Sequence, residues 1–336
     1  MRFAGVGVTR EGYRIALPGA PVEVLERCGV ERPVARLAEL AARTPGGLTV
    51  VVDSANGLLD APLAGAGIPV LRADPPVPAD GGAPAEVLAE LGRTRPGSLT
   101  ALPSAGWTMS GREEEIAAAD RASAPVEREL ALAGRLVAGG TGSEPLVALT
   151  FDDGPDPEFT PRVLDVLRRH DAPAAFFCIG LQALAHPGVV RRIADAGQTV
   201  GSHTWSHAYL PDLGPTGLAR QLGHTGEVLA EACGDGRAIR WLRPPYGGRS
   251  PALLRAVDAS GLVTVLWDVD AKDWSRPGPA VIAERVLSQV RPGSVILMHD
   301  GGGDRSQTVA ALPAVITGLR ARGYRIVDLD ALPAAA

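Results

Sequence analysis

Short apolar runs alternate with longer helical stretches along the C-terminal part of the chain, and this alternation constrains the fold more than any other feature. Each run has the length of a strand, and the stretches between runs have the apolar spacing of amphipathic helices. Such an alternation is typical of parallel strands covered by helices. About seven runs favour a distorted (β/α) barrel, and they span residues 146–151, 174–179, 199–202, 241–243, 263–269, 294–298 and 324–329.

The first 138 residues precede this alternation, and we expect them to form a small additional α/β domain of unknown role. Residues 48–53 are an apolar run, Asn56-Gly57 is a turn signal and residues 68–71 are a second run, which resembles a strand, helix, strand unit. The chain has 336 residues, which is more than one core usually needs, so two domains are a natural division.

The segments between the two predicted domains have distinct compositions. Residues 73–84 are crowded with Pro, Gly and Asp, whereas residues 113–136 are rich in Ala, Glu, Arg and Leu and are predicted to be one helix or two shorter ones. Residues 139–145 begin with Gly-Gly-Thr-Gly-Ser and are predicted to be a flexible linker. The C-terminal domain is then expected to span residues 146–336.

Charge and composition exclude several classes of protein. A formal charge of −5 and a pI near 5.7 give no basic surface of the kind that binds nucleic acid. The sequence has no apolar run that approaches the roughly 20 residues of a membrane span, and charged residues follow the N-terminus too soon for a signal peptide. We therefore expect a cytoplasmic protein, with Cys28, Cys178 and Cys233 reduced and mostly buried.

The first apolar run ends in two adjacent carboxylates, Asp152 and Asp153, followed by a forced turn at Gly154-Pro155. Neighbouring strand residues point to opposite sides, so one carboxylate can face a metal ion while the other faces a water molecule. Without further residues, a solvated turn rich in Asp is the default interpretation. The Asp pair acquires a chemical interpretation from the histidines that follow it.

All six histidines lie between His170 and His299, and two of them, His203 and His207, lie just after the third run. His203 and His207 are four residues apart, which places both imidazoles on one face of a helical turn. With one carboxylate they form a two-histidine, one-carboxylate set that leaves coordination positions open for water and substrate. The pattern favours a divalent metal ion, and Zn²⁺, Co²⁺, Ni²⁺ and Fe²⁺ all accept these ligands.

Three further segments place polar side chains where predicted strands end. Arg243 precedes two prolines that stiffen the backbone, so that the guanidinium can be held against a carboxylate. Asp270 and Asp273 follow the fifth run, and Trp274 beside them is either a wall for sugar stacking or an amphipathic anchor at a rim. His299 ends an otherwise apolar run and is a candidate general acid.

In their order and rough spacing these segments resemble the polysaccharide deacetylases (carbohydrate esterase family four, the NodB homology domain). The resemblance rests on Thr-Phe-Asp-Asp-Gly-Pro, His-Thr-x-x-His, Arg-x-Pro-Tyr, Asp-x-x-Asp-Trp and Leu-x-His-Asp. It covers residues 146–332, and the N-terminal region lies outside it and is not identified.

The resemblance implies a distorted barrel that binds zinc or a similar divalent ion through Asp153, His203 and His207. It also implies that Asp152 is the general base that takes a proton from metal-bound water, and that Arg243 orients Asp152. This set of roles describes a metal-dependent hydrolase.

The same resemblance implies roles around the substrate. The backbone N–H of Tyr246, together with the metal, would stabilise the oxyanion, and His299 would protonate the departing amine. Asp270 would tune the pKa of His299, with Asp273 as the alternative. Leu297 and Trp274 would line the acetyl pocket and the groove.

The expected activity is removal of the acetyl group from N-acetylated sugars, with N-acetylglucosamine units of chitooligosaccharide or peptidoglycan type as substrates. A small N-acetylated metabolite or biosynthetic intermediate is the alternative substrate, because cytoplasmic placement and an unusual N-terminal region suit it better. A non-haem iron oxygenase is disfavoured by the acid and base pair of Asp152 and His299, and an inactive binding module by the intact set of candidate groups. The sequence leaves the oligomeric state open, as well as whether the N-terminal region gates a cleft, mediates dimerisation or recognises substrate.

Overall fold

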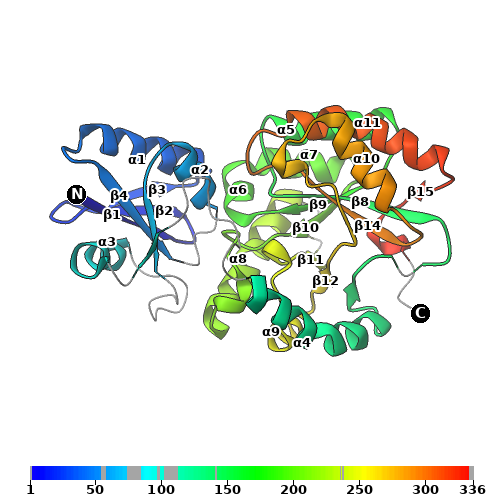
Figure 1. Ribbon diagram of the computed structural model, residues 1–336, viewed down its shortest axis with the longest axis horizontal. Helices are drawn as coiled ribbons and strands as arrows, with labels where there is room; N and C mark the ends of the chain where they lie inside the picture. The colour runs from blue at the N-terminus through cyan, green and yellow to red at the C-terminus, as the bar shows by residue number, and fades with distance from the viewer. Residues whose placement is uncertain are drawn as a thin grey trace. The chain divides into compact units, whose positions relative to one another are not determined.

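The computed structural model describes residues 2–53, 58–73, 85–96, 99–101, 113–140, 142–234, 236 and 238–332. The chain divides into two compact units, one formed by Met1–Ala118 with Thr204–Thr225 and the other by Ala119–His203 with Gly226–Ala336 (Figure 1). The predicted turn at Asn56-Gly57 and the Pro- and Gly-rich segment from 74 to 84 lie outside the described residues.

The first unit contains a six-stranded mixed sheet with the order β3-β2-β1-β4-β5-β6. Strands β1, β4 and β5 run parallel, and β2, β3 and β6 are antiparallel to their neighbours. The predicted strand, helix, strand unit is confirmed as β4, α2 and β5. The strands are β1 (Arg2–Val8), β2 (Gly12–Ala16), β3 (Glu23–Glu26), β4 (Leu48–Asp53), β5 (Val70–Ala73) and β6 (Thr100–Ala101), and the helices are α1 (Glu31–Arg43), α2 (Asp60–Gly65) and α3 (Ala85–Thr94).

Helix α3 packs directly on the backbone of β1. A Cβ added at Gly5 would lie 1.8 Å from the carbonyl oxygen of Ala85, so that only glycine permits this approach. Ala85, Leu88 and Ala89 are buried on the face of α3, and small residues there bring helix and strand close together.

The second unit is an α/β half-barrel of parallel strands, which confirms the predicted barrel class. Along the sheet the order is β13-β14-β8-β9-β10-β11-β12-β7, and β15 pairs with β8 off this path. Every residue of β8 is buried, as expected for a parallel strand covered on both faces. The strands are β7 (Leu136–Val137), β8 (Leu146–Asp152), β9 (Ala175–Cys178), β10 (Thr199–Ser202), β11 (Trp241–Leu242), β12 (Val263–Val265), β13 (Val269–Asp270), β14 (Ser294–His299) and β15 (Arg325–Ile326).

The apolar run 263–269, predicted as one strand, is divided into β12 and β13. Strand β13 lies at one end of the strand order, and β12 lies beside β7, which is at the other end. The three residues between them change partner: Leu266 N donates to Val137 O at 2.8 Å, and Asp268 N donates to Val295 O at 3.3 Å. The carboxylate of Asp268 accepts from Val295 N at 2.8 Å and from the Ser294 hydroxyl at 2.8 Å. This segment therefore joins the two ends of the half-barrel.

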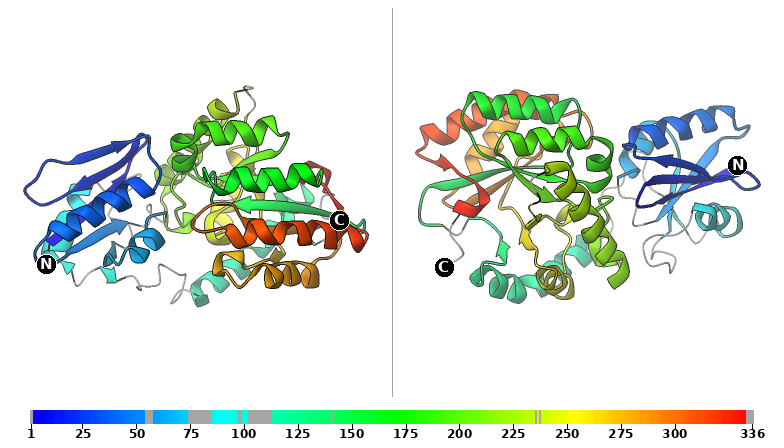
Figure 2. Two further views of the ribbon diagram at one scale, coloured as in Figure 1. Left: turned by 90° about the horizontal axis from the view of Figure 1, so that it is seen from above. Right: turned by 180° about the vertical axis from the view of Figure 1, so that it is seen from behind.

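Helices α5 (Phe159–Arg169), α7 (Pro187–Asp195), α10 (Pro279–Gln289) and α11 (Ser306–Ala321) cover the outer face of the sheet (Figures 1 and 2). Their apolar sides form one core with the strands, which includes Val147, Leu149, Leu167, Ile282 and Ile316. The remaining helices are α6 (Gly180–Ala185), α8 (Pro215–Cys233) and α9 (Pro251–Ala259). Ser250 caps α9 by accepting from Leu253 N at 3.2 Å, and Pro251 fits its first turn.

The predicted helical segment 113–136 is a single helix, α4 (Glu113–Leu132), followed by β7. Strand β7 pairs with β12, so the sheet of the second unit already includes residues that precede the predicted linker at 139–145. The division into domains 1–138 and 146–336 stays a prediction, whereas the half-barrel itself begins at Leu136.

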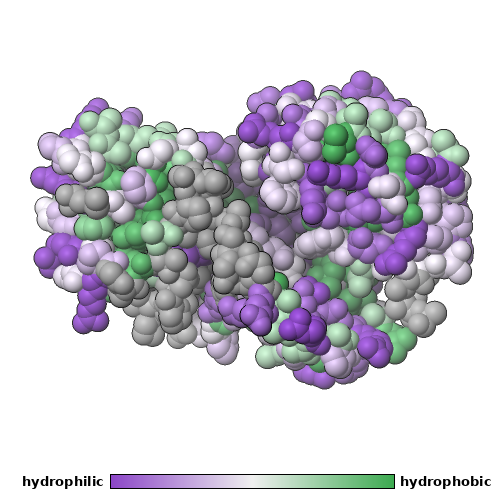
Figure 3. All heavy atoms as spheres, in the orientation of Figure 1, coloured by the Kyte–Doolittle hydropathy of each residue, from purple (hydrophilic) through white to green (hydrophobic). Residues whose placement is uncertain are grey.

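On the face drawn in Figure 3, hydrophobic residues form small groups among hydrophilic ones. None of the helices in the described part of the chain is long and apolar enough to cross a membrane. Cys28, Cys178 and Cys233 are buried and are not joined by disulfides, as expected.

Candidate active site

The chemically active side chains lie at the carboxyl ends of neighbouring parallel strands. Asp152 ends β8, His203 directly follows β10, Arg243 directly follows β11, and His299 ends β14. Carboxyl ends of parallel strands meet at one edge of a sheet, so residues that are far apart in sequence converge there.

Asp153, His203 and His207 form a group whose ligand atoms all lie within 4.8 Å of one another. His203 is buried at 2% exposure, and the other two residues are partly buried. Two imidazoles and one carboxylate at this spacing are a donor set that zinc and similar divalent ions accept. The structure thus brings together the three predicted ligands.

The hydrogen bond of His203 tests whether a cation fits this group. Its Nδ1 lies 2.8 Å from the carbonyl oxygen of Arg243, which only accepts hydrogen bonds, so a neutral ring carries its proton on Nδ1. Its Nε2 then presents a lone pair toward Oδ2 of Asp152 at 3.7 Å and Oδ1 of Asp153 at 3.5 Å. A lone pair facing two carboxylates is stabilised by a cation, which the donor set therefore fits.

Asp152 is held by the Arg243 guanidinium. Nη1 of Arg243 donates to Oδ1 of Asp152 at 2.8 Å and to the Thr150 hydroxyl at 2.7 Å. Asp152 is 3% exposed and Arg243 is fully buried. A buried, charge-assisted contact of this kind fixes the carboxylate in one orientation. The predicted contact between Arg243 and Asp152 is present.

Arg243 makes further contacts inside the half-barrel. Its Nη2 donates to Leu266 O at 3.1 Å, and its guanidinium carbon lies 4.3 Å from the centroid of the Phe177 ring. Burial lowers the pKa of Arg243 from its ordinary value, and the carboxylate of Asp152 opposes that change. The charged forms of Arg243 and Asp152 therefore stabilise each other inside the half-barrel.

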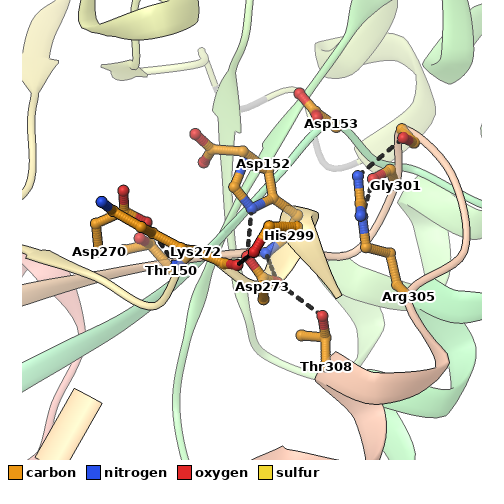
Figure 4. Close-up of polar contacts among 12 residues, drawn as sticks. Thr150, Asp152, Asp153, Asp270, Lys272, Asp273, His299, Gly301, Arg305 and Thr308 are labelled. Atoms are coloured by element: carbon orange, nitrogen blue, oxygen red, sulfur yellow. Dashed lines mark hydrogen bonds and ion pairs between the residues drawn. The ribbon is translucent and has the colours of Figure 1, made fainter. Parts of the chain in front are cut away.

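His299 is paired with Asp273, the alternative of the two acids considered, and the printed contact of Asp270 is with another residue. Nδ1 of His299 lies 2.7 Å from Oδ1 of Asp273, and the backbone N–H of His299 donates to Oδ2 of Asp273 at 2.9 Å. Thr308 of α11 also donates to Oδ2, at 2.7 Å. Asp270 instead accepts from the backbone N–H of Lys272 at 2.8 Å, as Figure 4 shows.

The physical reason lies in the chain direction after β13. Asp270 is the last residue of β13, whereas the next three residues turn so that Asp273 begins a 3-10 turn, Asp273–Ser275, with its side chain 1% exposed. Lys272 makes this turn in the left-handed region, at a φ of 48°. The turn carries Asp273 beneath the imidazole of His299.

The Asp273 carboxylate controls the charge of His299. Burial by itself lowers the pKa of His299, but the charge and hydrogen bond of Asp273 outweigh it and raise the pKa to about 9. The pKa of Asp273 is lowered in turn, since the contacts with His299 and Thr308 outweigh burial, which alone raises it. His299 is therefore protonated at neutral pH.

The remaining predicted residues lie on the same strand ends and loops. Tyr246 follows Pro244-Pro245 and has a φ of 60°, in the left-handed region that a non-glycine residue seldom adopts. Leu297 of β14 is 5% exposed and pairs in register with Asp270. Trp274 is 52% exposed.

Sequence reasoning missed residues that shape the Asp152-Asp153 turn. Asp300 is buried and accepts from the Thr160 hydroxyl, and a Cβ added at Gly154 would lie 2.5 Å from its carboxylate. Burial and the neighbouring carboxylates raise the pKa of Asp300 to about 7. Asp300 stands in the Leu-x-His-Asp segment, which was the available signal, whereas the Thr160 contact has no local signal in the sequence.

A second missed feature is the glycine loop after Asp300. Arg305 donates to Gly301 O at 2.6 Å and to Gly302 O at 2.8 Å (Figure 4). A Cβ added at Gly302 would lie 2.6 Å from Oδ2 of Asp153. The loop therefore packs against a candidate metal ligand, and glycine leaves space for it.

Fold and site together define a class of protein, an α/β half-barrel hydrolase with a candidate metal centre at the carboxyl ends of its strands. Residues 139–265 match the family model for polysaccharide deacetylase. A chitooligosaccharide deacetylase from Sinorhizobium fredii is 44% identical over 200 residues, which cover 56% of this chain and 92% of that protein. The chain belongs to the polysaccharide deacetylase family, and the expected resemblance is confirmed.

Solved structures agree with this assignment. A peptidoglycan N-acetylglucosamine deacetylase of known crystal structure has 37% sequence identity to this chain and a TM-score of 0.57. The match covers 60% of this chain and 94% of that one. A pseudoenzyme of carbohydrate esterase family four from Bacillus anthracis is 31% identical, with a TM-score of 0.55, and covers 59% of this chain and 68% of that one. Since one of these relatives is a pseudoenzyme, membership of the family does not by itself establish activity, which depends on the residues at the site.

Proposed function

We propose that this protein is a metal-dependent deacetylase that removes acetyl groups from N-acetylated sugars, with N-acetylglucosamine units as the substrate class. Relatives named chitooligosaccharide and peptidoglycan N-acetylglucosamine deacetylases support that class. A divalent ion, for which we propose Zn²⁺, would be held by Asp153, His203 and His207 and would supply Lewis acidity that lowers the pKa of a water molecule.

Asp152 is the proposed general base. Arg243 occupies one of its carboxylate oxygens, and the other faces Nε2 of His203 at 3.7 Å. A carboxylate held in this way accepts a proton from the attacking water without having to reorient. Arg243 thus acts as a positioning residue for Asp152.

His299 is the proposed general acid. Its pKa of about 9 keeps the imidazolium form at neutral pH, so that it has a proton to donate to the departing amine. Asp273 holds the ring through Nδ1, which leaves Nε2 as the nitrogen that donates. Asp273 takes the positioning role first considered for Asp270.

We assign the substrate contacts to three further residues. The left-handed backbone at Tyr246 supports the proposal that its N–H is directed at the oxyanion, because strained backbone at a non-glycine residue is concentrated at functional sites. Leu297 is proposed to line the acetyl pocket. Trp274, which is half exposed, is proposed to stack against a sugar ring.

The observation that carries the proposal is the register of β8 and β14, in which Asp152 is the partner of His299. The candidate base and the candidate acid therefore lie side by side on adjacent strands, next to the Asp–His–His group. An inactive binding module has no need for this complete set, and oxygen activation by iron has no need for the acid and base pair.

The test is acetate release from N-acetylglucosamine, chitooligosaccharides, peptidoglycan fragments and small N-acetylated metabolites, by protein stripped of metal and then reloaded with Zn²⁺ or Co²⁺. Metal-dependent release from the sugars is expected. Release from small metabolites alone would move the substrate class, and no release from any compound with either metal would contradict a deacetylase.

Asp152→Asn separates the base from the ligands. We expect it to bind metal as the parent does and to lose about 100-fold or more in kcat, since general base catalysis contributes on that order. Metal content by elemental analysis and acetate release are the two measurements. A variant nearly as active as the parent would show that Asp152 is not the base.

A further inference from the structure

The segment 203–207, here called the metal loop, has an unfavourable backbone conformation. Thr204 has a φ of 68° and His207 a φ of 57°, so that two non-glycine residues of five are in the left-handed region. The conformation is most unfavourable for a β-branched residue such as Thr204. Residues held in this way persist only where surrounding contacts stabilise them.

One such contact comes from Gln221 of α8. Its Oε1 accepts from the backbone N–H of Ser206 at 3.1 Å, and its Nε2 donates to the Ser206 hydroxyl at 2.8 Å. Ser206 is fully buried and Gln221 is 6% exposed. Both polar groups of the amide are thus used on the residue that directly precedes His207.

Two further hydrogen bonds reach the same loop from the N-terminal segment of the same compact unit. The indole N–H of Trp205 donates to Thr9 O at 3.0 Å, and the backbone N–H of Leu58 donates to Ser206 O at 3.3 Å. Trp205 is 3% exposed. Trp205 and Ser206 of the metal loop are therefore held by groups of Thr9, Leu58 and Gln221, which lie in three separate segments of the chain.

We propose that Gln221 is a positioning residue for the metal loop and that Thr9 and Leu58 assist it, so that the N-terminal segment supports the orientation of His207. The proposal rests on the proposed function only in taking Asp153, His203 and His207 as metal ligands. It gives the first 118 residues a role in metal binding that neither their sequence nor the family match indicates.

The test is a titration of metal-free protein with Co²⁺, followed by its visible ligand-field spectrum, with Zn²⁺ competition for the affinity. Gln221→Met removes both hydrogen bonds at similar side-chain volume. We expect it to bind metal about 10- to 100-fold more weakly, the range for residues that orient metal ligands, and to change the Co²⁺ spectrum because His207 is reoriented.

Gln198→Met is the matched control. Gln198 also uses its Oε1 to accept a backbone N–H, that of Ala174 at 2.6 Å, but it directly precedes β10, at the opposite end of that strand from the metal loop. We expect lower thermal stability in this variant with the metal affinity and the Co²⁺ spectrum of the parent. An equal loss of metal affinity in both variants would show that the effect of Gln221→Met comes from a general loss of stability, and it would overturn the proposal.

Two milder variants keep the test decisive if Gln221→Met does not fold. Ser206→Ala removes one of the two partners of Gln221, and Trp205→Phe removes the N–H that Thr9 O accepts together with part of the buried ring. Both variants should bind Co²⁺ more weakly than the parent, as Gln221→Met does. Parent-like affinity in all three variants would overturn the proposal while leaving the metal site intact, whereas a parent that binds no Co²⁺ would contradict the metal site itself.

Discussion

The pair of His299 and Asp273 shows how two residues define a chemical role that neither has alone. An isolated imidazole buried at this depth would be neutral, because burial lowers its pKa. The carboxylate of Asp273, 2.7 Å from Nδ1, reverses that effect and raises the pKa to about 9. Thr308 and the backbone N–H of His299 hold the carboxylate in place.

The pH dependence of kcat follows from this pair. His299 donates a proton, so activity is present below its pKa and is lost as the pH rises through it. Asp273→Asn removes the negative charge that raises the pKa, so the alkaline limb of the pH profile should move to lower pH. A bound divalent ion would also lower the pKa of His299, since it neutralises the charge of Asp153 that contributes to the shift, and parent and variant are therefore compared with the same metal.

Asp270→Asn is the control for that profile. The carboxylate of Asp270 accepts from Lys272 N, and its charge is not among the causes that shift the pKa of His299. Its alkaline limb should therefore stay in place. A profile that moves with Asp270→Asn and not with Asp273→Asn would return the positioning role to Asp270.

At the scale of elements, helix α4 is tied to α9 and to the turn that contains Tyr246. Arg249 lies in the loop before α9, forms ion pairs with Asp120 at 3.0 Å and with Glu127, and donates to Gly247 O at 2.9 Å. Leu130, Leu136 and Leu254 form an apolar cluster alongside these ion pairs. The segment before the predicted linker is thus an integral part of the half-barrel.

Arg249→Met should lower the free energy of unfolding by about 1 kcal/mol, because its partners at the half-buried interface lose a charged donor. In a unit of this size that corresponds to a fall in Tm of roughly 2–4 °C. Arg255→Ala breaks an exposed ion pair with Glu129 and should leave Tm unchanged. Thermal unfolding by circular dichroism measures both, and equal effects would show that burial does not distinguish the two pairs.

At the scale of the whole molecule, the candidate metal ligands come from segments about fifty residues apart, Asp153 after β8 and the two histidines after β10. A ligand set assembled in this way exists only in the folded chain. Metal binding and folding are therefore thermodynamically linked.

Zn²⁺ at 1,000 times its Kd should stabilise the folded parent by about 4 kcal/mol, and the Tm should rise with metal concentration. His203→Ala removes the most deeply buried ligand and should abolish this dependence. Differential scanning calorimetry over a series of Zn²⁺ concentrations makes the measurement. The same metal-dependent rise in both proteins would place the ion at another site.

Particular residues show how far sequence reasoning extends. The sequence predicts a site made of Asp152, Asp153, His203, His207, Arg243 and His299, because these residues lie at or just after the ends of apolar runs and strand ends converge in a parallel sheet. The sequence does not decide which carboxylate pairs with His299, because Asp270 and Asp273 both follow the same run. Their separation depends on a left-handed turn at Lys272 that no local pattern indicates.

The sequence by itself therefore determined the class of fold, the order of the strands' polar ends and the family, because buried parallel strands require continuous apolar runs and the chemistry requires particular side chains after them. Only the tertiary structure decided that the run 263–269 divides into β12 and β13, that β7 joins the sheet of the half-barrel, and that Gln221 and the N-terminal segment contact the metal loop. These features depend on hydrogen bonds between segments far apart in the chain, and such pairings leave no periodic trace in the sequence.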